Sequence, residues 1–385
     1  MKKIIVPRRM FLSLFALPAS LLAATFGLLL YTLPLISVTA TARVDTAPPA
    51  ATAQLRLIRT LKHDYQVNRL AWHPNNKELA VGQNLHKKIT VWNTETDQVL
   101  HVLNNEPGGV GVMAYSPDGK YLAVGRNFTA KIPDKYHVNI YDSNSGRLIR
   151  SLVPPLIIKG GGNNDVQALA FSPDSRYLVA NGYGAQSTAA VYDMKTGKTV
   201  ATLPASTKIT DAIMSLAYSP NGKLIAVGRI SGTLEIWATG LWKLHHQLDV
   251  NRPKAISALD FSPDGHRLAF GSFMGPGVDA KTGQIVSSTS PDDLVILDTS
   301  SLKRIKSFAS KHGGSVIRGL SFNPSGKMLI SGGAAKSIAV HDTNTGDRAV
   351  FLDGFPHVAY PALSRDGKLL AIGAGQEVRI YEMTD

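Results

Sequence analysis

The stretch Met113–Val124, which decides the fold, reads Met-Ala-Tyr-Ser-Pro-Asp-Gly-Lys-Tyr-Leu-Ala-Val. Alternating apolar residues stand on both sides of Ser-Pro-Asp-Gly, and this pattern predicts two strands joined by a tight turn. Pro117 presets φ near −65°, Asp118 can bond its own backbone, and Gly119 can adopt the left-handed conformation. One hairpin of this kind is marginally stable alone, so each copy must lean on another element.

The pattern returns six more times in a chain of 385 residues. Its anchor positions are Pro74, Pro117, Pro173, Pro220, Pro263, Pro324 and, in place of proline, Arg365. The spacings are 43, 56, 47, 43, 61 and 41 residues. A period in the forties with about four strand-like runs per copy is typical of a propeller blade. We therefore predict an all-β fold, a seven-bladed β-propeller over residues 55–385, preceded by an N-terminal hydrophobic signal or anchor segment.

Within each copy the second run ends in small residues, such as Ala123-Val124-Gly125, which suit crowded strands near a propeller axis. The last copy stops after its third run, whereas Leu55–Leu61 precedes the first complete copy. Pairing Leu55–Leu61 with Val378–Tyr381 would complete the seventh blade and remove the open edges between the first and last blades.

The third runs end in an aromatic or polar pair, and with the repeated turn these pairs carry a family resemblance. They are Trp92-Asn93, Tyr141-Asp142, Tyr192-Asp193, Trp237-Ala238, His341-Asp342 and Tyr381-Glu382. The chain resembles a WD-repeat (WD40-like) protein, which implies a non-enzymatic protein-binding platform. The Gly-His pair that opens a typical repeat is missing, so the sequence does not predict the family's buried Asp-His-Ser/Thr-Trp network in most blades.

Residues 1–42 have the layout of an export signal. Lys2, Lys3, Arg8 and Arg9 precede an apolar run over residues 10–33, and small residues lead up to Ala42. Arg8-Arg9 resembles a bacterial twin-arginine signal, although Pro7 and Ser13 depart from that pattern. The apolar run is long enough to span a bilayer, so it is either a retained membrane anchor or a signal cleaved after Ala42. The export route is either the twin-arginine route or the general secretion route. Residues 43–54 then form a flexible linker, and the propeller is placed in the periplasm or outside the cytoplasmic membrane.

Composition narrows the possible functions. The absence of cysteine excludes disulfides and thiolate metal sites. Four of the formal +13 charges belong to the export segment, which leaves a moderate excess of +9 without a basic block. Export disfavours nucleic acid as a partner, and aromatics are sparse among the basic residues. No catalytic constellation is evident, and no cofactor or metal is predicted, although the acidic residues Asp279, Asp292 and Asp293 leave Ca²⁺ binding in the fifth copy open.

The candidate binding residues belong to irregular connections. If the blades run from inner to outer strand, the links from second to third strand and between blades open on one face, where the length variation falls. Long segments there are Arg126–Tyr136, Val153–Asp165 and Ser272–Asp293. Insertions on one face of a repeat protein commonly mark its binding face. The predicted binding-face residues are Arg126, Lys131, Lys135, Lys159, Arg229, Lys281 and Lys336.

Positive charge at a propeller mouth suits an anionic partner, such as an acidic protein segment or a lipid headgroup surface. The first hypothesis is therefore a monomeric scaffold in the bacterial cell envelope that binds a protein partner. Membrane association would run through residues 10–33. Two alternatives stay open: an exported enzyme or cofactor-bearing propeller, and a small-molecule or sugar sensor at the axial mouth.

Overall fold

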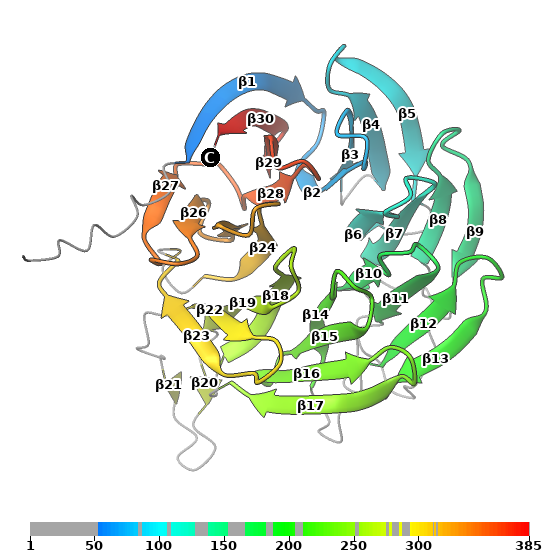
Figure 1. Ribbon diagram of the computed structural model, residues 1–385. Coiled ribbons are helices and arrows are strands. Elements are labelled where there is room, and N and C mark those ends of the chain that lie inside the picture. Colours follow the sequence, from blue (N-terminus) through cyan, green and yellow to red (C-terminus); the bar gives the residue numbers. More distant parts are fainter. Residues whose placement is uncertain are drawn as a thin grey trace, which may run out of the picture. The chain divides into compact units, whose positions relative to one another are not determined.

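The computed structural model describes residues 53–83, 87–105, 109–127, 138–152, 166–181, 188–204, 211–250, 254–274, 277–278, 285–286, 293–310, 312 and 315–384. In these residues the strands form seven four-stranded antiparallel sheets and one two-stranded sheet. Residues Pro49–Asp385 form one compact unit, and within it the four-stranded sheets follow one another around a ring (Figure 1). The predicted seven-bladed β-propeller is confirmed.

Each blade is named by its four strands, from the axis outward. Blade one has β2 (Val67–Trp72), β3 (Glu78–Gln83), β4 (Lys88–Asn93) and β5 (Gln98–Asn104). Blade two has β6 (Gly109–Tyr115), β7 (Tyr121–Asn127), β8 (Val138–Asp142) and β9 (Leu148–Leu152). Blade three has β10 (Leu169–Phe171), β11 (Tyr177–Asn181), β12 (Ala189–Asp193) and β13 (Thr199–Leu203). Blade four has β14 (Ile213–Tyr218), β15 (Leu224–Arg229), β16 (Thr233–Ala238) and β17 (Lys243–Asp249).

The remaining blades follow the same order. Blade five has β18 (Lys254–Phe261), β19 (Arg267–Met274), β22 (Leu294–Asp298) and β23 (Arg304–Phe308), with the short strands β20 (Gly277–Val278) and β21 (Ile285–Val286) between β19 and β22. Blade six has β24 (Ile317–Phe322), β25 (Met328–Gly333), β26 (Ile338–Asp342) and β27 (Arg348–Leu352). Blade seven has β28 (Tyr360–Leu363), β29 (Leu369–Ala374), β30 (Glu377–Thr384) and β1 (Gln54–Lys62).

The repeated turn folds as its residues predict. Gly119 has φ of 75°, and its amide donates to the carbonyl of Ser116 at 2.9 Å. The serine hydroxyl donates to Asp118 Oδ1 at 2.7 Å and accepts a hydrogen bond from the Tyr121 amide at 3.0 Å. Asp118 Oδ1 also accepts from the Lys120 amide at 3.2 Å. Side chains of the turn therefore satisfy several of its backbone groups. The neighbouring blade satisfies another, because the amide of Asp118 donates to Ser175 Oγ at 2.9 Å.

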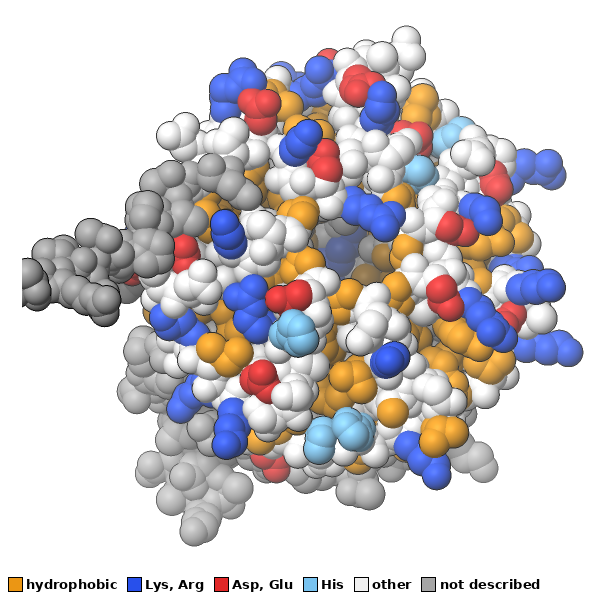
Figure 2. Space-filling model, viewed as in Figure 1, with side chains coloured by type: hydrophobic (Ala, Val, Ile, Leu, Met, Phe, Trp, Pro, Cys, Tyr) orange, Lys and Arg blue, Asp and Glu red, His pale blue; other side chains and the backbone are white. Residues whose placement is uncertain are grey.

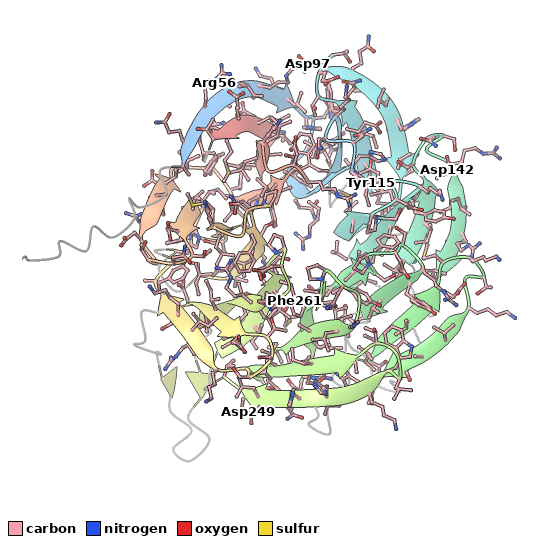
Figure 3. The ribbon with its side chains drawn as sticks, viewed as in Figure 1. Arg56, Asp97, Tyr115, Asp142, Asp249 and Phe261 are labelled. Atoms are coloured by element: carbon pink, nitrogen blue, oxygen red, sulfur yellow. The ribbon has the colours of Figure 1, made fainter. Side chains whose placement is uncertain are left out.

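Neighbouring blades interlock through glycines near the ends of the second strands. A Cβ placed on Gly125 would lie 2.7 Å from Val112 Cγ1 and 2.7 Å from Val166 Cγ1 of the next blade. Gly82 meets Val110 of the next blade in the same way. The predicted small residues thus provide the space into which the adjacent first strand inserts a branched side chain. Hydrophobic clusters fill the gaps between sheets, and Figure 3 shows Tyr115 and Phe261 toward the inside of the ring, with Asp97 and Asp142 nearer its rim.

The ring closes as the sequence predicts. β1 pairs antiparallel with β30, and the register places Leu55 opposite Met383, Leu57 opposite Tyr381 and Leu61 opposite Val378. A register shift between Leu57 and Arg59 interrupts the ladder at Ile58. The first and last strands of the described chain therefore share one blade, which leaves no gap in the ring.

The predicted signal or anchor, residues 1–42, and all but the last two residues of the predicted linker, residues 43–54, lie outside the described part of the chain. Within the described part, no helix is long and apolar enough to cross a membrane.

Candidate functional site: the loop face

The two ends of the blades differ in how their strands are connected. We call the end that carries the second-to-third strand links and the links between blades the loop face, and the opposite end the turn face. The β20–β21 hairpin belongs to the loop face, and Figure 1 draws it faintly, so the view is from the turn face. The two sides of the blade-five insertion meet at its base, where the amide of Ser272 donates to the carbonyl of Asp293 at 2.8 Å.

The structure separates the predicted binding-face residues into three groups. Lys131, Lys135, Lys159 and Lys281 lie outside the described residues. Lys336 is exposed in the turn between β25 and β26, with φ of 59°. Arg126 and Arg229 are 6% and 1% exposed, and they occupy corresponding positions at the ends of β7 and β15. Among the described members of the set, only Lys336 presents its charge to solvent.

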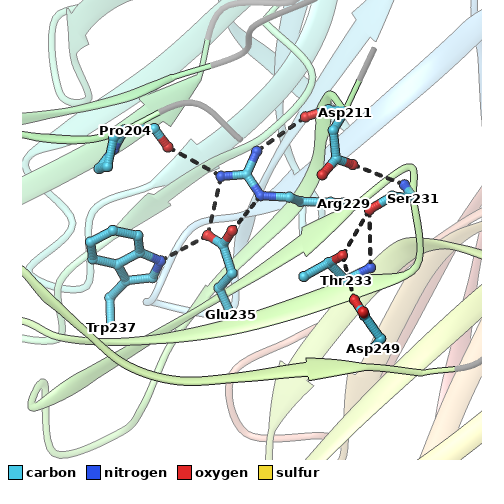
Figure 4. A network of polar contacts seen from close by, with 8 residues as sticks. All are labelled: Pro204, Asp211, Arg229, Ser231, Thr233, Glu235, Trp237 and Asp249. Carbon is cyan, nitrogen blue, oxygen red and sulfur yellow. Dashed lines mark hydrogen bonds and ion pairs between the residues drawn. The ribbon is translucent and has the colours of Figure 1, made fainter. Parts of the chain in front are cut away.

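Arg229 is held in a buried ion pair (Figure 4). Its Nε donates to Glu235 Oε1 at 2.6 Å, and its Nη2 donates to Glu235 Oε2 at 3.1 Å. The remaining donors reach the carbonyls of Asp211, at 3.1 Å, and Pro204, at 3.2 Å. Trp237 Nε1 donates to the same carboxylate at 3.0 Å. Because carboxylate and carbonyl oxygens surround the guanidinium, Arg229 supports the blade and is not an open charge for a partner.

The network continues toward the outer strand of blade four. Asp211 Oδ1 accepts the Ser231 amide at 3.0 Å, which fixes the tight turn between β15 and β16. Ser231 and Thr233 share a hydroxyl contact of 2.8 Å, and Thr233 Oγ1 donates to Asp249 Oδ1 at 2.8 Å. One connected set of polar groups thus ties the link between blades three and four to three strands of blade four.

Blade six carries a different buried network at the equivalent place. His312 Nε2 lies 3.0 Å from Ser331 Oγ, and its Nδ1 lies 2.7 Å from Ser337 Oγ. The amide of His312 donates to Ser310 Oγ, and Ser310 in turn contacts Asp293. Burial lowers the pKa of His312, while the charge of Asp293 raises it. The ring serves here as a hydrogen-bonding bridge between an interblade link and strand β25.

Blade one has a third buried network, again with different residues. His63 lies edge-on to Trp92 with ring centroids 5.6 Å apart, and its Nδ1 is 3.0 Å from Gln83 Nε2. Burial, together with the charge of Lys88, lowers the pKa of His63 to about 4, although the charge of Asp64 opposes the shift. His63 therefore stays neutral at physiological pH, as its packing against Trp92 requires.

The missing Gly-His pair put the family's buried Asp-His-Ser/Thr-Trp network in doubt in most blades, and the networks of blades one, four and six consist of other sets of residues. Buried hydrogen bonds join the interblade link to β3 in blade one, to β15 in blade four and to β25 in blade six, and the residues differ from blade to blade. The sequence offered one usable signal for blade four: Arg229 and Glu235 flank a short Ser-Gly turn, which brings them together across a hairpin. Within the described residues, no group of three or more His, Asp or Glu side chains is placed to hold a metal ion. Asp293, considered for Ca²⁺, is buried against Ser310.

Comparison with known proteins agrees with this geometry. Three stretches, residues 55–93, 197–238 and 302–342, match the family described as WD domain, G-beta repeat. Each match begins on the outer strand of one blade and ends on the third strand of the next, for example β1 through β4. The chain is thus a seven-bladed β-propeller in which three segments match the WD40 repeat.

The chain is also similar to the WD repeat-containing protein VIP3 of Arabidopsis thaliana. The two chains are 30% identical over 128 residues, which cover 30% of this chain and 38% of that relative. The likeness therefore spans well under half of either protein.

Proposed function

We propose that this propeller is a non-enzymatic platform that binds a protein partner on its loop face. The observation that carries the proposal is the contrast between the two ends of the blades. The turns between first and second strands, on the turn face, repeat one compact form with hydrogen bonds inside the turn, as at Ser116–Gly119. The irregular connections gather on the loop face, where the buried networks of blades one, four and six hold their bases. WD-repeat propellers typically bind proteins, and irregular loops on a rigid scaffold are common binding elements.

The partner we favour is acidic. Lys336 is exposed on the loop face, and Lys131, Lys135, Lys159 and Lys281 belong to connections whose described ends lie on that face. Arg229 is excluded from the contact surface because it is buried and forms an ion pair with Glu235. A diffuse positive face attracts an acidic segment and aligns it before close contact forms.

Charge reversal on matched faces tests the platform. The loop-face variant combines Lys131→Glu, Lys135→Glu and Lys336→Glu, and its control combines Lys120→Glu, Lys223→Glu and Lys368→Glu on the turn face. Both change the net charge equally. Crosslinking and pull-down from envelope fractions should lose the partner with the first variant and keep it with the second. Equal recovery with both, or a stoichiometric metal or chromophore in the purified protein, would contradict a charge-guided, non-enzymatic platform.

The placement of the platform is a separate proposal: export to the bacterial envelope, with residues 10–33 either removed or retained as an anchor. Fractionation of cells producing Arg8→Lys/Arg9→Lys distinguishes the routes, because loss of export indicates the twin-arginine pathway. The mass of the exported chain then tells cleavage after Ala42 from a retained anchor. Light scattering on the same sample tests the proposed monomeric state. Recovery of the unmodified chain only from the cytosol would refute the placement and leave the binding face to be tested on its own.

A further inference from the structure

Positive charge gathers on one wall of the opening at the centre of the ring. The first strands of the blades enclose this opening, and Figure 2 shows a hollow there with Lys or Arg side chains at depth. The relevant wall is formed by β2 of blade one, β28 of blade seven and β24 of blade six, which are neighbours in the ring (Figure 1). These strands carry Arg69, Tyr360 and Arg318.

Arg69 is fixed by its surroundings. Its Nη1 donates to the carbonyl of Asn68 at 2.7 Å, and its Cζ lies 5.1 Å from the centroid of the Tyr360 ring. The side chain is half-buried, and a guanidinium retains further N–H donors after one such bond. Burial lowers the pKa of Arg69, contact with Tyr360 raises it, and the charge of Arg318 lowers it. The guanidinium is therefore fixed in position, it is partly shielded from water, and a second positive charge lies nearby.

Arg318 is the second positive group. It is exposed, and it comes from a strand separated from β2 by β28. In the described part of the chain, neither Arg69 nor Arg318 forms an ion pair with a carboxylate, in contrast to Arg229. Arginines from two different blades thus lie close enough for the charge of one to act on the other, and neither has a carboxylate partner among the described residues. Such an arrangement costs free energy until an anion enters.

The one acidic side chain of the first strands does not relieve this charge. Asp260 belongs to β18, and its Oδ2 accepts the amide of Phe322 at 2.7 Å. Burial raises the pKa of Asp260 to about 7, and hydrogen bonds from the Phe322 and Phe261 amides oppose the rise. Its carboxyl is directed to the interface of blades five and six.

The position of Arg69 carries no charge in blades two to five. Positions corresponding to Arg69 in the first strands of blades two to five are Val112, Ala168, Ser215 and Ala258. The positive charge is therefore a local feature of blades six, seven and one, and it does not arise from the repeat.

We propose that Arg69 and Arg318, with Tyr360 between them, bind a single oxyanion group, a phosphate or a carboxylate, in the axial opening. The planar guanidinium fork matches the paired oxygens of either group. Limited hydration strengthens such charge-assisted bonds, and the anion removes the repulsion between the two arginines. The site accepts this group from a free small molecule or from an acidic side chain of a partner. It is distinct from the loop-face lysines of the proposed platform.

The test measures binding to the full chain by isothermal titration calorimetry, with three probes at matched ionic strength: inorganic phosphate, succinate and a poly-glutamate peptide. We expect saturable binding of at least one probe, weakened at least tenfold by Arg318→Gln. Arg318→Lys, which keeps the charge but loses the fork, should be intermediate. The matched control is Arg348→Gln, because Arg348 also lies over an aromatic ring, with its Cζ 4.5 Å from the Phe351 centroid, but on the outer strand β27.

Arg69→Gln should weaken binding similarly, but it removes a half-buried group, so Arg318→Gln carries the test. Near-UV circular dichroism establishes that each variant is folded. Phosphate or succinate binding that depends on Arg318 assigns the site to a free anion, and dependence seen only with poly-glutamate assigns it to a partner's carboxylates. Equal binding by Arg318→Gln and Arg348→Gln, or no saturable binding of any probe to the folded wild type, overturns the proposal. Neither outcome depends on the pull-down that tests the platform.

Discussion

Arg365 Nη1 donates a hydrogen bond to the carbonyl oxygen of Pro117 at 3.0 Å, which links the first turn of blade seven to that of blade two. The blade-one turn joins the same contact, because the amide of Asp366 lies 3.3 Å from Asn76 Oδ1. Arg365 stands where the other six copies have proline. The departure from the repeat thus connects turns from three blades on the turn face.

This relationship predicts the effect of restoring the repeat. Arg365→Pro loses an exposed hydrogen bond, worth about 0.5–1.5 kcal/mol. It also restricts the unfolded chain, which is worth about 0.4–1 kcal/mol where the turn accepts proline. We expect a net change in the free energy of unfolding below about 1 kcal/mol by urea denaturation. Arg365→Ala loses the hydrogen bond but does not restrict the unfolded chain, so it should be less stable than Arg365→Pro. The reverse order of stability would contradict this account.

A second prediction concerns the contact between blades at Gly125. Gly125→Ala forces a methyl group against Val112 and Val166, each 2.7 Å from the added carbon. Overpacking of this kind costs about 1–3 kcal/mol, because backbone and side chains must shift. Gly240→Ala is the control, since an added Cβ there meets nothing within 4 Å. Gly125→Ala should have a lower melting temperature than Gly240→Ala in thermal unfolding. Equal melting temperatures would show that the blades shift enough to accommodate the added methyl group.

A third prediction contrasts a buried ion pair with an exposed one. Arg229→Gln leaves the Glu235 carboxylate without its buried counter-charge and should destabilise the fold by about 3–5 kcal/mol. Arg56→Gln removes the partner of Glu382, where the side chains are 73% and 44% exposed, and should cost about 1 kcal/mol or less. Chemical denaturation measures both. If the two substitutions cost the same, Arg229 does not depend on Glu235 as the geometry indicates.

A fourth prediction concerns pH. The pKa of Asp260 is about 7 in the folded protein against an ordinary value of 3.8, because burial disfavours the charge. The folded state therefore binds more protons than the unfolded state between these values, and the contribution of Asp260 to stability falls as pH rises through this window. Asp260→Asn keeps a carbonyl acceptor for the Phe322 amide and should flatten this decline, whose slope is at most about 1.4 kcal/mol per pH unit.

The control for this experiment is Asp353→Asn, which removes an exposed carboxyl and changes the net charge equally. Urea unfolding at intervals from pH 4 to pH 7 provides the two slopes. Parallel curves for wild type and Asp260→Asn would mean that this carboxyl titrates normally in the folded protein.

The fold was predictable because each of its determinants is local or repeated. Gly119 and its counterparts mark every first turn, and their spacing marks every blade. Ring closure was predictable from the unmatched run Leu55–Leu61. The last copy lacks a fourth strand and the chain begins with an extra strand, so pairing the two completes the seventh blade.

The buried networks were not predictable in the same way. Arg229 looked like a surface cation because its neighbours in sequence are a glycine and a turn, yet the carboxylate of Glu235 and two carbonyls from an interblade link surround it. That surrounding depends on how blades three and four meet, which no local pattern records. Arg69 and Arg318 were overlooked for the same reason: they are 249 residues apart in sequence and share a space only after the ring has closed.

The pairing of β1 with β30 also governs the order in which the chain can fold. During synthesis β1 is the first of the described strands to be made, and β30 is the last, so β1 must wait for its partner while six blades assemble. Until then blade seven is incomplete and the growing ring has two open edges. Pairing of β1 with β30 is therefore a late step in folding, and it requires the intervening blades to be in place.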